Sequence, residues 1–209
     1  MLARAAILLA AGSGLAFAPA QHNPNPWEEI LRDDGVVIWS RPVPGLKFNE
    51  IRAETTLDFP AAAVWALFEA IEKYPQFMPY TAELRVLSTF PDGRYIYVVT
   101  DPPIVSRRDY AAKLTDYVDA KNGIYQRTVH EANDRAPPKP EDVERMVRMR
   151  GRWTIETIDA GHTRVEYVFN ADPGGLVPSW IINAGAKRSI SSLFAAIKKR
   201  VANPSWRPQ

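Results

Sequence analysis

Alternation of apolar and polar residues predicts that most of the chain forms β-strands. Ile51, Ala53, Thr55 and Leu57 share one face of a strand over residues 50–57. The turn sequence FPDG separates two of the further strands. Runs of β-forming residues predict these further strands at 36–41, 82–89, 94–100, 109–118, 124–130, 143–158 and 163–171.

Apolar residues at helical spacing predict the helices. Residues 59–74 follow this pattern after Pro60. Residues 27–34 (WEEILRDD) are expected to form a short helix that Gly35 ends. The clearest helix covers residues 178–202, and its apolar face consists of Ile182, Ala186, Ile190, Leu193, Ile197 and Val201.

Together these elements predict an α+β fold in a single domain. The apolar face of an antiparallel sheet must be covered, and only the C-terminal helix is long enough to cover it. We therefore expect a strongly curved antiparallel sheet wrapped around a long C-terminal helix.

The first twenty residues differ from the rest of the chain. A short basic start (MLAR) and an apolar run precede small residues at Ala18–Ala20, as in a secretory signal peptide. We interpret residues 1–20 as a signal peptide cut before Gln21, and 21–26 as a connector. An uncleaved leader or an anchor helix is the alternative. Cleavage predicts an exported protein, periplasmic or extracellular.

Composition and motifs exclude several classes of protein. A formal net charge of +2 gives no support for nucleic-acid binding. Cysteine is absent, which excludes disulfides, thiolate metal sites and a cysteine nucleophile. The three histidines have no ligand-like spacing, and hydrolase and phosphate-loop motifs are missing. We expect no catalytic residue, no metal and no cofactor.

Four motifs occur in the order found in a known family. Residues 106–110 (SRRDY) resemble the Arg-Asp-aromatic motif of the StAR-related lipid transfer (START) domain. Residues 147–158 resemble its strand with glycine before tryptophan, 172–183 its turn into the last helix, and 27–39 its first helix and strand. Over residues 27–204 the chain thus resembles an exported bacterial START domain, within the helix-grip (birch-pollen-allergen-like, SRPBCC) superfamily. Residues 205–209 form a tail.

This resemblance implies a helix-grip fold with an internal hydrophobic cavity for one lipid or sterol-like molecule. The C-terminal helix and loops would gate it, with Gly174 and Gly175 as a hinge. Binding and transfer by a monomer, with transient membrane contact, is the expected function. The candidate cavity and lid residues are Met149, Trp153, Ile155, Tyr167, Phe169, Leu176, Val177, Trp180, Ile181, Ile190 and Phe194.

The SRRDY stretch itself has no histidine or cysteine beside it, so we interpret it as structural and not catalytic. Arg108, Asp109 and Tyr110 form the family motif. Arg108 and Asp109 are expected to pin the loop 101–106 through charge-assisted hydrogen bonds, and Arg107 is expected to be solvated.

Two other functions stay open. The same cavity could serve a cyclase or aromatase, for which the first candidate residues are Tyr95, Tyr97, Tyr110, Asp116 and Arg108. The domain could also sense a lipid without transferring it. Which of Lys113, Thr115 and Asp116 points inward is open at this stage.

Two features allow a structural or a membrane-related interpretation. Arg148, Arg150 and Arg152 share one strand face, where they either form cross-strand ion pairs, for instance with Glu166, or bind anionic lipid. Trp180 is either packed at the start of the last helix or meets a membrane interface.

Overall fold

The computed structural model describes residues 26–103 and 105–203, except for the side chains of Ser179, Trp180, Asn183 and Ala184. The signal-peptide prediction for residues 1–20 and the tail at 205–209 lie outside the described residues. The strands are β1 (Glu28–Asp33), β2 (Val36–Arg41), β3 (Glu50–Leu57), β4 (Thr81–Phe90), β5 (Gly93–Thr100), β6 (Arg108–Asp119), β7 (Ile124–Glu131), β8 (Glu144–Arg145), β9 (Arg148–Thr157) and β10 (Thr163–Asp172). The helices are α1 (Ala61–Glu69), α2 (Ser179–Val201) and the short 3-10 helices η1 (Ile71–Gln76) and η2 (Asn133–Arg135).

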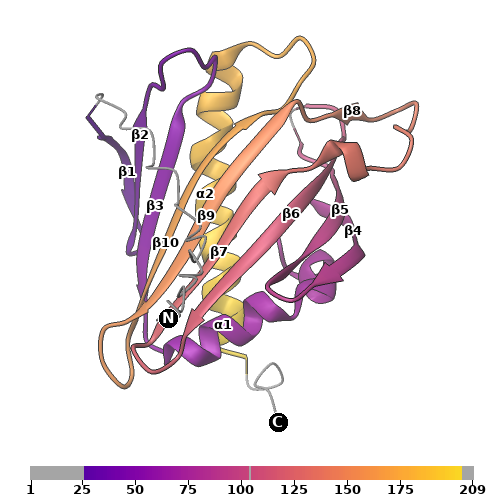
Figure 1. Ribbon diagram of the computed structural model, residues 1–209. Coiled ribbons are helices and arrows are strands. Elements are labelled where there is room, and N and C mark those ends of the chain that lie inside the picture. The colour runs from indigo at the N-terminus through magenta and orange to yellow at the C-terminus, as the bar shows by residue number, and fades with distance from the viewer. Residues whose placement is uncertain (1–25, 104, 204–209) are drawn as a thin grey trace, which may run out of the picture.

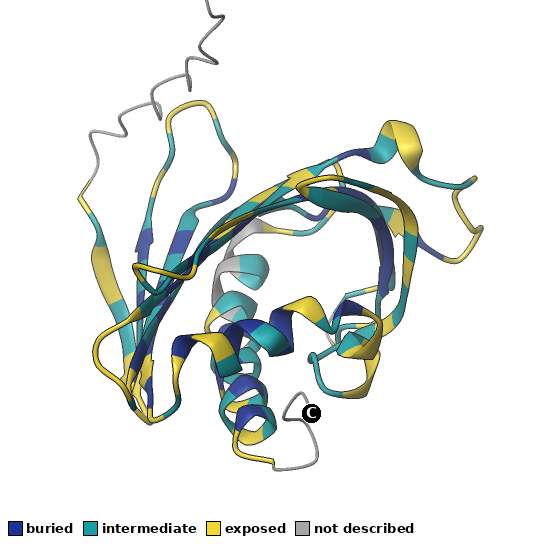
Figure 2. Ribbon diagram, turned by 60° about the horizontal axis from the view of Figure 1, so that its bottom comes forward, coloured by how far each residue is buried: buried dark blue, intermediate teal, exposed yellow. Residues whose placement is uncertain are grey.

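The predicted architecture is confirmed. Nine strands form one antiparallel path in the order β1-β2-β3-β10-β9-β7-β6-β5-β4, and β8 pairs with β6 in parallel. The sheet curves around α2, which runs along its concave side, and α1 crosses near one end of α2 (Figures 1 and 2).

The expected helix at residues 27–34 is wrong, because this segment is strand β1. A register shift between Glu29 and Leu31 interrupts the period-two alternation, so the strand pattern is hidden in the sequence. Asp34 (φ 46°) and Gly35 (φ 70°) form the two-residue turn into β2. Positive φ at both positions is the usual geometry of a tight hairpin, and this Asp-Gly pair was the signal for it.

The strand expected at 143–158 is divided into two. Glu144–Arg145 forms β8, which pairs with β6, whereas β9 begins only at Arg148. The break brings the loop between β7 and β9 back over β6. Amide and carbonyl groups of Asn133 hold it there, because its Oδ1 accepts from Ala111 N at 3.0 Å and its Nδ2 donates to Met146 O at 2.7 Å.

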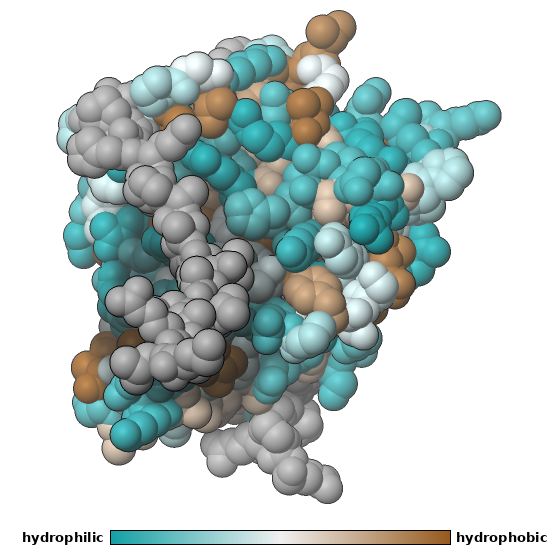
Figure 3. Space-filling view, in the orientation of Figure 1, coloured by the Kyte–Doolittle hydropathy of each residue, from teal (hydrophilic) through white to brown (hydrophobic). Residues whose placement is uncertain are grey.

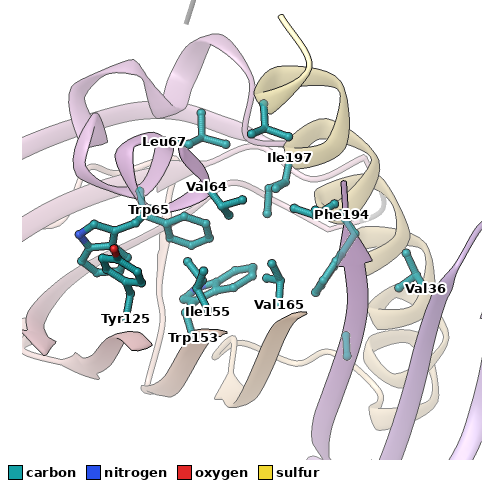
Figure 4. Close-up of a cluster of buried hydrophobic side chains, with 14 of the residues drawn as sticks. Val36, Val64, Trp65, Leu67, Tyr125, Trp153, Ile155, Val165, Phe194 and Ile197 are labelled. Atoms are coloured by element: carbon teal, nitrogen blue, oxygen red, sulfur yellow. The ribbon is translucent and has the colours of Figure 1, made fainter. Parts of the chain in front are cut away.

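Most buried apolar side chains form one core beneath α1 and α2. The rings of Trp65, Phe68, Trp153 and Phe194 pack there with aliphatic residues of β2, β3, β9 and β10 (Figure 4). A second, smaller core lies under η1 and contains Ile71, Ile96, Val98, Ala112 and Leu114.

Burial along α2 is uneven. Among its described side chains, the buried ones all come from its C-terminal half: Ile190, Phe194, Ile197 and Val201. At the same end Lys198 Nζ donates to the backbone carbonyl of Asp34 and lies 3.3 Å from its carboxylate. The described side chains of the N-terminal half are half-buried or exposed. The helix is therefore packed into the core chiefly through its last three turns.

Candidate functional site

Between the two cores, the concave face of the sheet keeps accessible apolar surface. Val129 of β7, Met149 of β9 and Tyr167 and Phe169 of β10 are only half-buried there, as is Tyr110 of β6. α2 packs closely against β1, β2, β3 and α1, toward one side of the sheet. Because close-packed interiors leave little accessible side-chain surface, these half-buried residues mark an incompletely filled part of the concave face beside α2, which is called the cavity below.

The candidate cavity residues fall into three groups. Four belong to the closed core, three line the accessible concave face, and the rest lie at or near the start of α2. The core group is Trp153, Ile155, Ile190 and Phe194. The concave-face group is Met149, Tyr167 and Phe169. In the last group Leu176 is fully exposed, Val177 and Ile181 are half-buried, and the Trp180 side chain lies outside the described atoms.

The chain before α2 contains the two predicted hinge glycines. Both lie in the left-handed region, Gly174 at φ 69° and Gly175 at φ 68°. A Cβ on Gly174 would lie 2.7 Å from the carbonyl oxygen of Arg145, so this glycine also permits a close backbone approach. Motion at these glycines stays a prediction.

Arg108 lies beside this turn and is 97% buried, with a relative exposure of 3%. Its Nη1 donates to the backbone oxygen of Ser106 and to the Ser106 hydroxyl, so the guanidinium contacts the loop before β6. Burial lowers the pKa of Arg108, and the charge of Glu144 partly offsets this. The buried Nε has no hydrogen-bond partner in the described structure.

Asp109 points to the opposite, convex face and is fully buried there. Arg145 donates to its two carboxylate oxygens at 3.0 and 2.6 Å, and the Tyr97 hydroxyl donates at 2.9 Å. Burial, together with the hydrogen bond to Asp109, raises the pKa of Tyr97 to about 12. Asp109 thus fastens the loop carrying Arg145 to the back of the sheet, and not the loop 101–106.

Arg107, predicted to be solvated, is half-buried and lies 3.4 Å from Asp142. Tyr110 points into the cavity. The SRRDY stretch therefore connects three places: the loop before β6, the convex face and the cavity.

Replacing Arg108 tests its contact with the loop. We expect Arg108→Leu to lower the free energy of unfolding by about 1–3 kcal/mol, because hydrogen bonds from a charged donor are lost, or to weaken ligand retention. Thermal melting and ligand binding measure the two effects. Normal melting together with normal binding would contradict this role.

The sequence interpretation missed Arg127, which is only 2% exposed on the concave face of β7. It forms a bidentate pair with Asp116, with both N–O distances 2.6 Å. It also donates to the Phe68 carbonyl at the end of α1 and to the Tyr74 hydroxyl at 3.2 Å. The opposite charges of Asp116 and Arg127 could have indicated this ion pair in the sequence. However, only the register of β6 and β7 shows that the two residues face each other.

The same register shows which of Lys113, Thr115 and Asp116 points inward. Asp116 points to the concave side, as Leu114 does, whereas Lys113 and Thr115 lie on the convex side. Tyr95 and Tyr97 also lie on the convex side, so the five candidate residues for a cyclase do not gather in one place.

The arginine-rich convex face forms an ion-pair network. Arg52 lies 2.8 Å from Glu166, Arg164 lies 2.9 Å from Glu54 and 2.8 Å from Glu156, and Arg150 lies 3.8 Å from Glu50. Hydrophilic side chains predominate over the part of this face that is coloured in Figure 3. Of the three arginines for which such pairs were predicted, Arg150 forms one, whereas Arg148 donates to the Asn170 side-chain oxygen at 3.2 Å. Glu166 pairs with Arg52 and Arg164 instead, so the ion-pair interpretation holds for the face but only in part for the residues that suggested it.

Among the described residues, two features are absent. None of these helices is long and apolar enough to cross a membrane. No three acidic or histidine side chains within residues 26–103 and 105–203 gather as a metal-ion site.

The sequence and the fold match known proteins. Residues 57–198 match the polyketide cyclase/dehydrase and lipid transport family, and the chain belongs to this family. The fold is the START-like helix-grip fold. A solved fragment of a STAR-related lipid transfer protein from Xanthomonas axonopodis is similar, with a TM-score of 0.76 and 25% identity over 85% of this chain and 99% of that chain.

Two further matches extend the comparison. An uncharacterised protein of Pseudomonas aeruginosa is 25% identical over 201 residues, which cover 94% of this chain and 95% of the relative. A more distant solved structure is the Zhui aromatase/cyclase from Streptomyces, with a TM-score of 0.54, 14% identity, and coverage of 73% of this chain and 92% of that chain.

Proposed function

We propose that this protein binds a hydrophobic, lipid-like molecule in the cavity and transfers it between membranes. The observation that carries the proposal is the half-buried apolar surface on the concave face, bordered on both sides by closed cores. Burial of a ligand there gains roughly 25 cal/mol for each Å² of apolar surface removed from water. The similarity to the STAR-related lipid transfer protein also supports the proposal that this protein binds and transfers a lipid-like molecule.

A cyclase is the second candidate, because the family and the Zhui match include such enzymes. Tyr110 is the candidate residue that favours it, since its ring lies in the cavity. Asp116 argues against it, because both of its oxygens are engaged by Arg127. A general acid or base needs a free position within reach of a substrate. The arrangement therefore supports binding over catalysis.

The proposal predicts that the purified protein carries a lipid. Solvent extraction followed by mass spectrometry should detect a bound apolar molecule, and vesicle-to-vesicle transfer of that molecule should accelerate with added protein. Binding without acceleration would favour a lipid sensor. Repeated empty preparations that also bind nothing from a lipid panel would contradict the proposal.

We also propose an exported location, supported by the leader pattern of residues 1–20. The intact mass of the same preparation from an exporting host tests this, because cleavage leaves a chain that begins at Gln21. An uncleaved chain retained in the cytoplasm would contradict it.

A further inference from the structure

Two tyrosine side chains of the cavity have hydroxyl groups without partners. Tyr110 of β6 and Tyr167 of β10 both point from the concave face, and both keep accessible surface. Within the described structure neither hydroxyl makes a hydrogen bond. Since tyrosine hydroxyls in largely apolar surroundings usually find a partner, both can bond to a polar atom of a ligand that enters the cavity.

The surroundings of Tyr167 keep its hydroxyl in place. Its ring stacks on Trp153, with centroids 3.9 Å apart, and on Phe169, with centroids 5.0 Å apart. Its edge lies over Gly151, where an added Cβ would come within 3.2 Å of the ring and 3.4 Å of the hydroxyl. The glycine leaves the space that the end of the tyrosine ring occupies, so the hydroxyl position is built into the sheet.

Both phenols are neutral at physiological pH. Burial raises the pKa of Tyr110 to about 12. Burial also raises the pKa of Tyr167, and the nearby Tyr110 adds to this effect, so the two phenols interact electrostatically. A neutral phenol both donates and accepts a hydrogen bond.

The charged groups of the concave face have partners for most of their polar atoms, although the Nε atoms of Arg94 and Arg108 have none within the described residues. Asp116 and Arg127 are bound to each other, and Arg108 donates to Ser106 beside the opening loop. The described side chains around the two tyrosines are otherwise apolar, among them Val129, Met149 and Phe169. This environment disfavours an ionised group and accepts a neutral one.

We propose that Tyr110 and Tyr167 recognise the ligand by hydrogen bonds to one neutral oxygen function, a hydroxyl or carbonyl, on an otherwise apolar molecule. This inference rests on the proposed function, and it adds the ligand class and the residues that select it.

Removal of single oxygen atoms tests the inference. Displacement of a fluorescent apolar dye by 1-dodecanol, dodecane and dodecanoate is measured for the full chain and for Tyr110→Phe and Tyr167→Phe. Each substitution should lower the affinity for 1-dodecanol about three- to tenfold, as expected for the loss of one hydrogen bond. The affinity for dodecane should stay within twofold. The matched control is Tyr117→Phe. Tyr117 lies on the convex side of β6, the strand that also carries Tyr110, and is 57% exposed, so this substitution should change the affinity for neither 1-dodecanol nor dodecane.

The unaltered protein gives a second test, because 1-dodecanol carries a neutral oxygen group and dodecanoate an ionised one. At pH 8, 1-dodecanol should bind more tightly than dodecanoate. Tighter binding of dodecanoate, or equal 1-dodecanol affinity in all variants, would overturn the inference while leaving lipid binding intact. If the dye and dodecane do not bind at all, the proposed function fails and the inference fails with it.

Discussion

Arg127→Leu should lower the free energy of unfolding by about 3–5 kcal/mol, the usual cost of removing one partner of a buried ion pair. The substitution leaves the Asp116 carboxylate without its bidentate donor. It also leaves the Phe68 carbonyl at the C-terminal end of α1 without its side-chain donor, and such carbonyls have no partner within their own helix. Chemical denaturation with a two-state fit measures the change.

The control for this prediction is Arg32→Ala, which removes an exposed pair with Glu29. We expect a change below about 0.5 kcal/mol there. A second comparison uses Asp116→Leu combined with Arg127→Leu, which should recover part of the loss because no charge is then left unpaired. Equal stability of Arg127→Leu and the unaltered protein would show that this pair does not hold α1 to the sheet.

Asp109→Asn should destabilise the protein by about 2–4 kcal/mol, because the carboxylate that holds Arg145 and Tyr97 loses its charge. The loop between β7 and β9 should then become accessible to proteases, which limited proteolysis measures. The matched control is Asp142→Asn in the same loop, since its pair with Arg107 is exposed. A loop as resistant in Asp109→Asn as in the control would contradict the prediction.

This effect should depend on pH. Burial alone would raise the pKa of Asp109, but the hydrogen bonds from Arg145 and Tyr97 outweigh it and hold the pKa below its ordinary value of about 4. A depressed carboxyl pKa stabilises the fold above the unfolded-state value and ceases to do so as the pH falls through the folded-state value. The stability difference between the unaltered protein and Asp109→Asn should therefore be constant near neutrality and shrink below about pH 4.

The elements with regular patterns could be predicted from sequence, and those shaped by register could not. The apolar spacing of α2 and the alternation in β3 depend on one element each, and both were correct. β1 was misread because its bulge removes the alternation. Arg127 was missed for a related reason, since its meaning depends on Asp116 of the neighbouring strand.

The candidate site shows the same limit. Apolar residues on one strand face predicted both core and cavity lining, and sequence offers no volume by which to separate them. The structure separates Trp153 and Ile155, which are buried, from Met149 on the same strand, which is half-buried. The difference arises because Trp153 and Ile155 pack with α1 and the C-terminal half of α2 in the main core, whereas Met149 lies against the smaller core.

The uneven burial of the described side chains of α2 gives this helix one end fixed in the core and one end with less buried contact. Ile190, Phe194 and Ile197 hold the last turns in the core, and Lys198 ties them to the first hairpin. Residues before Ile190 contribute no fully buried side chain among those described. Local opening free energies follow the amount of buried contact. We therefore expect that lifting the first turns of α2 costs less than unfolding the domain, which would let the cavity exchange its contents while the core stays intact.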